Sequence, residues 1–308
     1  MVYRLRIFGS KERCYLYFSE IVRQNVLQFK IFIIRAGSNL RIGNFFEIDK
    51  DDLFLFAGPC VLEKSDINDE IAKKLKDKCD ELSIKYVFKA SFDKANRSSI
   101  ASCRGPGIED GLKELKRVSE KFNIPTVTDI HESYQAELAA KYVDILQIPA
   151  FLARQTDLLI AAAKTGKPVN VKKPQFMSGE DMKNVVKKLH ESGCGDIMLT
   201  ERGTMFGYNN LVVDYRNLID MKDFDYPLIM DATHSTQRPG GEGSKSGGDP
   251  KYAPYLAKCA AVCGVKGFFF EVHPNPTEAL SDASTMMSLD GFLDFLPTLK
   301  TITDIANA

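Results

Sequence analysis

The sequence predicts a single α/β domain folded as a (β/α)8 TIM barrel, and three observations lead to this fold class. Short apolar runs alternate with amphipathic helical patterns from about residue 46 onwards. No change of composition marks a linker after residue 45, so one uninterrupted domain is expected. An open doubly wound sheet is the alternative, but no glycine-rich dinucleotide fingerprint follows any apolar run.

Eight apolar runs are expected to form the barrel strands, because strands that alternate with helices pair in parallel. They are Leu53–Ala57, Tyr86–Lys89, Thr126–Asp129, Ile145–Ile148, Val169–Val171, Ile197–Leu199, Leu228–Asp231 and Gly267–Glu271. Helices are expected at Asp66–Leu82, Gly107–Phe122, Tyr134–Lys141, Arg154–Thr165, Gly179–Ser192 and Tyr252–Gly264, among others. The segment "NFFEIDKDD" before the first strand is expected to form a short hairpin over the lower end of the barrel.

The N-terminal part differs from the rest in charge. Met1 to Arg41 holds eight Lys and Arg but two Asp and Glu, a net of +6, although the whole chain is neutral. We therefore separate an N-terminal extension, 1–45, from a catalytic barrel, 46–308. The extension is interpreted either as a poorly ordered segment or as an accessory element. A transit peptide is disfavoured because the segment is not rich in serine, and its apolar run is too short to span a bilayer.

Composition excludes some classes of partner. The 308 residues are 44% hydrophobic and 27% charged, as in ordinary globular proteins. A net charge of zero does not support binding to nucleic acid or to an anionic membrane. Seven cysteines without CxxC spacing, and without a secretory signal, are interpreted as reduced thiols, which predicts a cytoplasmic protein.

Polar residues stand at the carboxyl end of every predicted strand, where barrel enzymes place their active sites. One such residue would be explained as a solvated loop residue, but eight together are not. In chain order they are Cys60, Lys89, Asp129, Gln147, Lys172 with Lys173, Arg202, His234 and Glu271.

Two chemical subsets emerge at these strand ends. The first is cationic and suits phosphate or carboxylate groups of more than one anionic substrate; its members are Lys89, Lys94, Arg97, Lys172 and Arg202. The loop "FDKANRSS" is therefore predicted to bind anions, with Ser98 and Ser99 as neutral donors. The glycine-rich stretch Arg238–Pro250 is predicted to close over the substrate.

The second subset consists of Cys60, His234, Glu271 and Asp282, a mixed soft and hard set that suits Zn²⁺, Fe²⁺ or Mn²⁺. His273 competes with His234 as a ligand. It would face the same side as Glu271 if the strand stayed regular, but Pro274 suggests that it does not. A Cys–His nucleophile pair is the rival interpretation, although no oxyanion-hole motif or orienting group is evident.

Ten motifs occur in order along the chain. They are "AGPC", "FKASFDKANRSS", "RGPGIEDGL", "TDIHE", "QIPAFLARQTDLL", "NVKKPQF", "TERG", "FGYNNLVVD", "DATHS" and "SDAST". Together they closely resemble the 3-deoxy-D-manno-octulosonate 8-phosphate synthase family, from about Phe46 to the C-terminus. The related 3-deoxy-D-arabino-heptulosonate 7-phosphate synthases usually carry a "KPRTS"-like loop where this chain has "KANRSS".

The resemblance implies a transferase that condenses phosphoenolpyruvate with D-arabinose 5-phosphate and water, in the synthesis of a lipopolysaccharide precursor. It assigns phosphoenolpyruvate to Lys89, Ser91, Lys94, Gln147, Lys172 and Arg202. It assigns the sugar phosphate to Asn96, Arg97 and Ser98. Catalytic roles fall on Asn96, Asp129, Lys172 and His234.

The family has a metal-dependent and a metal-free branch, and the metal-free branch carries asparagine at the position of Cys60. The resemblance therefore implies the metal-dependent branch, with Cys60, His234, Glu271 and Asp282 as ligands, and a homotetramer. Three alternatives are kept: a seven-carbon synthase that uses erythrose 4-phosphate, a non-catalytic sugar-phosphate-binding barrel, and a metal-dependent aldolase that does not use phosphoenolpyruvate.

Overall fold

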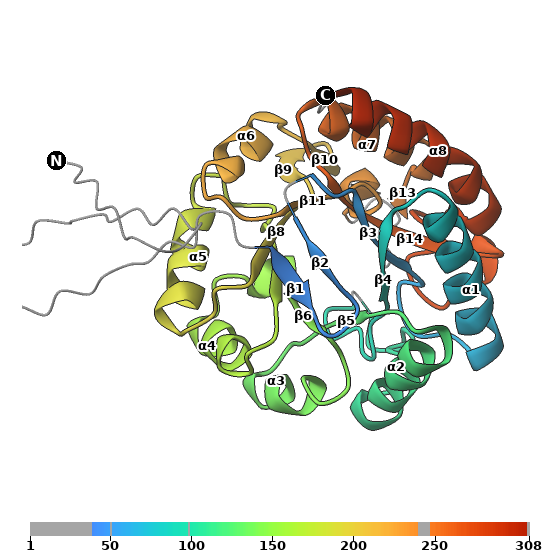
Figure 1. Cartoon of the computed structure of the whole chain (residues 1–308), viewed down its shortest axis with the longest axis horizontal. Coiled ribbons are helices and arrows are strands. Elements are labelled where there is room, and N and C mark those ends of the chain that lie inside the picture. Colours follow the sequence, from blue (N-terminus) through green and yellow to red (C-terminus); the bar gives the residue numbers. More distant parts are fainter. Residues whose placement is uncertain (1–38, 50, 98, 240–246, 307–308) are drawn as a thin grey trace, which may run out of the picture.

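Eight parallel strands close into a barrel inside a ring of helices (Figure 1). This computed structural model describes residues 39–49, 51–97, 99–239 and 247–306. The barrel strands are β3 (Phe54–Gly58), β4 (Lys85–Lys89), β5 (Thr126–Asp129), β6 (Ile145–Ile148), β7 (Val169–Lys172), β8 (Ile197–Glu201), β11 (Leu228–Asp231) and β14 (Gly267–His273). Each strand pairs with the next, and β14 also pairs with β3, which closes the barrel and confirms the predicted fold class.

The strands lie within two residues of their predicted ranges, and so the strand ends fall where the sequence placed them. The helices are α1 (Ser65–Glu81), α2 (Ile108–Phe122), α3 (Ser133–Ala139), α4 (Thr156–Lys164), α5 (Met182–Glu191), α6 (Arg216–Lys222), α7 (Ala253–Val262) and α8 (Leu289–Ala306). Sequence analysis did not name α6 and α8. The first is only seven residues long, and the second contains Pro297, a residue that disfavours helix interiors.

Shorter strands follow the carboxyl ends of several barrel strands. A hairpin of β9 (Thr204–Gly207) and β10 (Asn210–Val212) follows β8. Its turn residues Tyr208 and Asn209 both have positive φ angles, as tight hairpin turns require. The remaining short strands are β12 (Gln237–Arg238), β13 (Gly247–Gly248) and β15 (Met287–Ser288).

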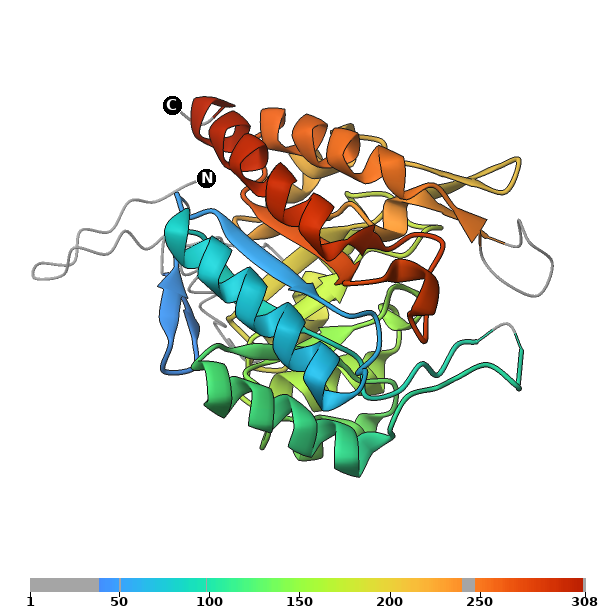
Figure 2. The ribbon, with the colours of Figure 1, turned by 90° about the vertical axis from the view of Figure 1, so that its right-hand side faces the viewer.

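The predicted hairpin is present at the opposite end. Strands β1 (Leu40–Ile42) and β2 (Phe46–Ile48) pair antiparallel and lie across the amino-terminal end of the barrel (Figures 1 and 2). Strand β1 therefore lies before residue 46, in the part of the chain that sequence analysis assigned to the N-terminal extension. Most of that extension, 1–38, lies outside the described residues.

The hairpin closes the barrel by completing its inner core. Leu40, Ile42 and Ile48 of the hairpin join one apolar cluster with inward side chains of the barrel strands. Those barrel side chains are Phe54, Phe56, Val87, Val127, Ile145, Met198, Ile229 and Phe269. The tight turn needs a glycine at position 43. Gly43 has a φ of +51°, and a side chain there would put its Cβ 2.8 Å from Asp144 Oδ1.

The strand period of two explains why a polar layer lies above this apolar cluster. Side chains two residues apart on a strand face the same way. Val87 in the cluster is therefore followed by Lys89, and Phe269 by Glu271, both buried. Equivalent pairs on other strands are Val127 with Asp129, Ile145 with Gln147, Met198 with Thr200 and Ile229 with Asp231. The fold thus presents polar groups in the barrel interior at its carboxyl end.

None of the helices in the described parts of the chain is long and apolar enough to cross a membrane.

Candidate active site

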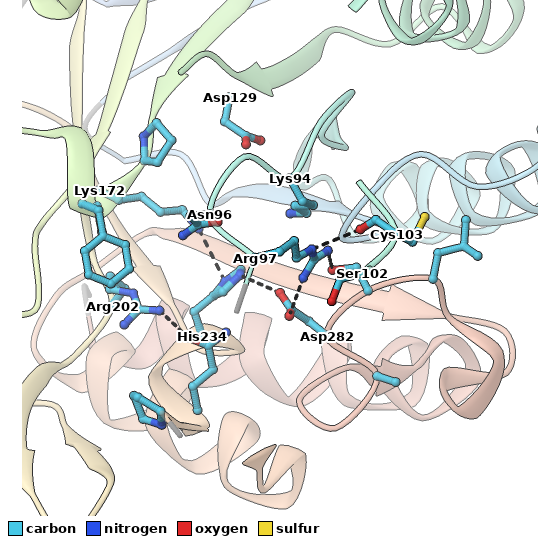
Figure 3. A pocket seen from close by; sticks show the side chains of 18 of the residues that line it. Lys94, Asn96, Arg97, Ser102, Cys103, Asp129, Lys172, Arg202, His234 and Asp282 are labelled. Atoms are coloured by element: carbon cyan, nitrogen blue, oxygen red, sulfur yellow. Dashed lines mark hydrogen bonds and ion pairs between the residues drawn. The ribbon is translucent and has the colours of Figure 1, made fainter. Parts of the chain in front are cut away.

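A cavity of about 850 Å³ opens at the carboxyl ends of the barrel strands. This volume lies within the range of small-molecule sites, roughly 300–1,000 Å³. Eleven predicted site residues line the cavity: Lys89, Lys94, Asn96, Arg97, Ser99, Asp129, Gln147, Lys172, Arg202, His234 and Asp282. Figure 3 shows most of these side chains converging from separate strand ends and loops.

Opposite charges are paired in the floor of this cavity. Lys89 Nζ donates to Glu271 Oε1 at 3.0 Å, and Lys172 Nζ donates to Asp231 Oδ2 at 2.5 Å. All four side chains are at most 7% exposed. An unpaired charge at this depth would be strongly unfavourable, so each lysine and its carboxylate stabilise one another in the ionised form. Lys172 also lies over the ring of Phe269, 3.6 Å from its centroid.

Three of the four predicted metal ligands meet beside this floor. One ligand atom from each of Cys60, Glu271 and Asp282 lies within 4.8 Å of the others. Cys60 and Glu271 are fully buried, whereas Asp282 reaches the cavity. Thiol and carboxylates in such a group fit a divalent transition metal.

The fourth predicted ligand, His234, stands next to these groups. Its Nε2 lies 3.4 Å from Glu271 Oε2 and 3.9 Å from Asp282 Oδ2. Its Nδ1 lies 2.7 Å from Asp231 Oδ2. A histidine that binds a metal through one ring nitrogen commonly donates the other N–H to a carboxylate, which fixes its orientation. The placement of Asp231 matches that arrangement, so His234 stands where it could join the group of Cys60, Glu271 and Asp282 in holding a divalent cation.

The environment of Cys60 argues against a Cys–His nucleophile. Its Sγ contacts Ser281 Oγ at 3.1 Å and Asp282 Oδ2 at 3.2 Å, and neither of these partners is an imidazole. Burial raises the pKa of this thiol well above its usual range, and the negative charges of Asp282 and Glu271 add to that effect. A catalytic thiol needs the opposite shift. A bound divalent cation would deprotonate a thiol in this position.

Lys94 completes the cationic wall of the cavity. Its Nζ lies 3.9 Å from Glu271 Oε1. Burial acts against its charge, but Cys60, Glu271 and Asp129 outweigh burial and raise the pKa of Lys94. Across the cavity, Arg202 donates to Gln237 Oε1 at 2.6 Å, while its second terminal nitrogen has no partner within the described residues. Both side chains therefore present positive charge to a ligand.

Arg97 connects the anion-binding loop to the metal-ligand group. Its guanidinium donates to Ser281 Oγ and to Asp282 Oδ1, the latter at 3.4 Å, as Figure 3 shows for Arg97 and Asp282. The other oxygen of Asp282 faces Cys60. One carboxylate thus contacts both the candidate sugar-phosphate arginine and the candidate metal site.

Asp129 belongs to a buried hydrogen-bond chain. It accepts a hydrogen bond from Ser91 Oγ and lies 3.0 Å from His131 Nε2. Burial acts to raise the pKa of the Asp129 carboxyl, but His131, Lys94 and Lys89 outweigh it and hold that pKa well below its usual range. Asp129 is therefore ionised and oriented by two neighbours.

Comparison with known proteins places this geometry in a family. The family model described as the DAHP synthetase I family matches residues 33–308, nearly the whole chain. The chain belongs to the DAHP synthetase I family.

Curated relatives of this DAHP synthetase I family member have high identity over most of its length. The chain is 53% identical over 264 residues to the 2-dehydro-3-deoxyphosphooctonate aldolase of Fusobacterium nucleatum, covering 86% of this chain and 95% of the relative. It is 53% identical over 269 residues to the protein of the same name from a Cyanothece species, with coverage of 87% and 97%. The corresponding Shewanella oneidensis protein is 47% identical over 277 residues, with coverage of 90% and 96%.

Some predicted residues do not line the cavity of this family member. Cys60, Ser91 and Glu271 are buried beneath it and contact residues that line it. Lys173 turns away: it is buried and donates to Thr204 Oγ1 and to the carbonyls of Pro174 and Met177. Ser98, and residues 240–246 of the predicted closing loop, lie outside the described residues.

The expectation for His273 was half right. The strand stays regular through His273, so Pro274 does not interrupt it as expected. The side chain nevertheless stays out of the metal-ligand group, and its Nε2 lies 3.8 Å from Glu63 Oε1. The regular strand therefore does not make His273 a member of this group, and its ion-pair contact is with Glu63 instead.

Sequence reasoning missed His131, Asp231 and Ser281 as site residues. His131 stands two residues after Asp129 in "TDIHE", and Asp231 ends a predicted strand in "DATHS", so both carried a positional signal. Ser281 carried none, because a serine before Asp282 is unremarkable until folding brings it against Cys60 and Arg97.

The shifted pKa of Asp129 predicts how stability depends on pH. A carboxyl whose folded-state pKa is depressed contributes stability above its unfolded pKa, about 3.9, and loses that contribution as pH falls further. We expect Asp129→Asn to lower the free energy of unfolding by about 1–3 kcal/mol at neutral pH, since it removes a partner from buried donors. The deficit should be constant from about pH 7 to 5 and shrink only below about pH 4.

Urea unfolding of both proteins at several pH values measures this difference. A deficit that stays constant below pH 4 would show that folding leaves the pKa of this carboxyl unchanged, and a deficit that grows as pH falls from 7 to 5 would show that folding raises it.

Proposed function

We propose that the chain condenses phosphoenolpyruvate with D-arabinose 5-phosphate and water to form 3-deoxy-D-manno-octulosonate 8-phosphate and phosphate. The names of the curated relatives support this transferase activity. The observation that carries it is one cavity in which five cationic side chains surround buried, ionised carboxylates; the cations are Lys89, Lys94, Arg97, Lys172 and Arg202. Two phosphorylated substrates, one also a carboxylate, need such a set.

The arrangement of the cations supports separate positions for the two substrates. Phosphoenolpyruvate would bind between Lys94, Lys172 and Arg202, with Lys89, Ser91 and Gln147 in support. Gln147 is held for this by Asn170, which donates to its Oε1 at 3.1 Å. The sugar phosphate would bind nearer the loop that carries Asn96, Arg97 and Ser98. Asn96 is exposed at the cavity wall, as expected for a group that meets a ligand from solvent.

The reaction would form one C–C bond and break one C–O bond. C3 of phosphoenolpyruvate attacks the aldehyde carbon of the sugar, whose oxygen takes a proton and becomes a hydroxyl. Water adds at C2 and loses a proton, and phosphate leaves by cleavage of its bond to C2. Asp129 and His131, 3.0 Å apart, would serve as a proton relay for the sugar oxygen or the water. Lys172 and His234, 3.5 Å apart, also line the cavity. Aligning two mutually repelling anions supplies much of the rate, on the order of 7–11 kcal/mol for well-oriented reactants.

We also propose that the protein belongs to the metal-dependent branch, with Cys60, His234, Glu271 and Asp282 as ligands of Zn²⁺, Fe²⁺ or Mn²⁺. The chemistry of the donors and the contact of His234 with Asp231 support this assignment. When bound, the ion would supply positive charge that polarises oxygen groups beside it. The bound ion would also fix the relative positions of Cys60, His234, Glu271 and Asp282 beside the substrates.

The choice of sugar tests the proposed activity. Phosphate release from phosphoenolpyruvate should require arabinose 5-phosphate, because the loop "KANRSS" differs from the "KPRTS"-like loop of the seven-carbon synthases. The assay contains Mn²⁺ and compares arabinose 5-phosphate with erythrose 4-phosphate and with no sugar. Preference for erythrose 4-phosphate would move the protein to the seven-carbon branch. No release with either sugar would favour a sugar-phosphate-binding protein.

Removal of metal tests the branch. Treatment with a strong chelator should abolish activity, because Cys60, Glu271 and Asp282 would lose the cation that balances them. Addition of Zn²⁺, Fe²⁺ or Mn²⁺ should restore it, and metal content is measured on the same samples. Full activity in protein without measurable metal would contradict the metal-dependent assignment.

We propose further that the protein is a homotetramer, and that the β9–β10 hairpin takes part in a contact between copies. The hairpin extends beyond the barrel on the side of the active-site loops (Figure 2) and exposes large apolar side chains. On the hairpin, Phe206 is 75% exposed, Tyr208 is 93% exposed and Met205 is also exposed. Apolar groups gathered on one hairpin favour burial against another surface.

A cytoplasmic location stays a prediction of the sequence.

Charge on this hairpin should therefore disrupt assembly. We expect Phe206→Asp to lower the mass in solution from four subunits to two or one, as measured by light scattering at several concentrations. Ile305→Asp at the far end of α8 is the matched control, since Ile305 is 73% exposed and should tolerate the charge. An unchanged mass for Phe206→Asp would remove the hairpin from the contact.

A further inference from the structure

A second group of polar atoms runs alongside the candidate metal ligands. Its members are the side chains of Glu63 and His273 and the backbone N–H of Leu280. Glu63 stands three residues after Cys60, His273 two after Glu271, and Leu280 two before Asp282. Each member is therefore on the same short segment as one ligand. A contact among the three would fix the relative positions of all three ligand-bearing segments.

Glu63 makes that contact. Its Oε1 accepts the N–H of Leu280 at 2.9 Å and lies 3.8 Å from Nε2 of His273. The side chains of Glu63 and His273 are 5% and 3% exposed. One carboxylate oxygen thus lies between the last residue of β14 and the loop that carries Asp282. Because the two side chains are nearly inaccessible to solvent, their attraction is weakly screened, whereas Leu280 itself is 48% exposed.

The orientation of His273 is set by its other nitrogen. Its Nδ1 accepts the N–H of Asn275 at 3.0 Å, so the ring proton is carried on Nε2, which faces Glu63. Nε2 has no hydrogen-bond partner within the described residues. Its ion-pair contact is with Glu63 Oε1, 3.8 Å away. The Nε2–H donor of the His273 ring therefore faces the Glu63 carboxylate, and the two groups attract each other.

Glu63 is in turn held by helix α1. Its backbone N–H donates to Asn68 Oδ1 at 3.1 Å, and its carbonyl accepts from Asn68 Nδ2 at 2.9 Å. Asn68 is fully buried. The segment from Cys60 to Glu63 is thereby anchored to a rigid element, and the carboxylate projects from this anchor toward the other two segments.

We propose that Glu63 is a positioning residue that keeps Cys60, Glu271 and Asp282 in register for a divalent cation. This inference rests on the proposed metal-dependent function. Asp282 depends most on Glu63, because Leu280 is held by its Oε1 and Asp282 follows two residues later. Loss of an outer partner of a metal site typically weakens metal binding by about 10- to 100-fold.

Titration of the metal-stripped, full-length protein with Co²⁺ tests the proposal. The absorption band of thiolate-bound Co²⁺ reports occupancy at a cysteine, and its absence in Cys60→Ser assigns it to Cys60. We expect Glu63→Ala to bind Co²⁺ at least 10-fold more weakly, with altered ligand-field bands. Glu63→Gln keeps an oxygen that can accept the Leu280 N–H and should stay within about threefold of the unmodified protein.

Glu278→Ala is the matched control, because it removes an exposed carboxylate from the same loop and should leave binding unchanged. Circular dichroism checks that each variant is folded. If Glu63→Ala does not fold, Glu63→Asp decides, since its shorter side chain keeps the charge but withdraws the oxygen from Leu280. It should also bind at least 10-fold more weakly.

The outcomes separate the two proposals. A Cys60 band in the unmodified protein with equal affinity and spectrum in folded Glu63→Ala, or in folded Glu63→Asp, overturns the role of Glu63 and leaves the metal site standing. No Cys60 band in the unmodified protein overturns the metal-dependent assignment and this inference with it.

Discussion

The structure of the active site depends on the balance of buried charge inside the barrel. Lys89 is paired with Glu271, and Lys172 with Asp231, all nearly inaccessible to solvent. Neither member of a pair is tolerable alone at this depth. Each carboxylate holds its lysine in place, and Asp231 opposes the burial that lowers the pKa of Lys172, so the cationic side chains face phosphate and carboxylate groups without a rearrangement of the site. Such preorganisation is where enzymes gain most electrostatic stabilisation.

The remainder of the fold serves to bury this layer at one end of the barrel. Strand alternation puts apolar side chains one step below it, and the β1–β2 hairpin fills the opposite end with Leu40, Ile42 and Ile48. An apolar cluster thus lies below the charged floor, and among the described residues the cavity is lined by strand ends and loops. The same period of two that fills the lower layer with Val87 and Phe269 directs Lys89 and Glu271 upward.

The loops add what strands alone cannot supply. Asp282 presents one oxygen toward Cys60 and the other toward Arg97, and Ser281 contacts both of these residues. The candidate metal and sugar-phosphate sites therefore share a loop. Its position is fixed from behind by the Glu63 contact to Leu280. A change in charge at either site acts on the Asp282 carboxylate, so the two sites are electrostatically linked.

The sequence alone determined the barrel, its eight strands, the covering hairpin and eleven of the residues that line the cavity. It did so because these depend on local periodicity and on one topological rule, that parallel strand ends meet. Only the tertiary structure decided which polar groups meet one another. It pairs Lys172 with Asp231, buries Lys173 away from the cavity, and sets Glu63 between His273 and Leu280. These contacts join residues far apart in the chain, and their selection depends on side-chain packing, which no short sequence pattern encodes.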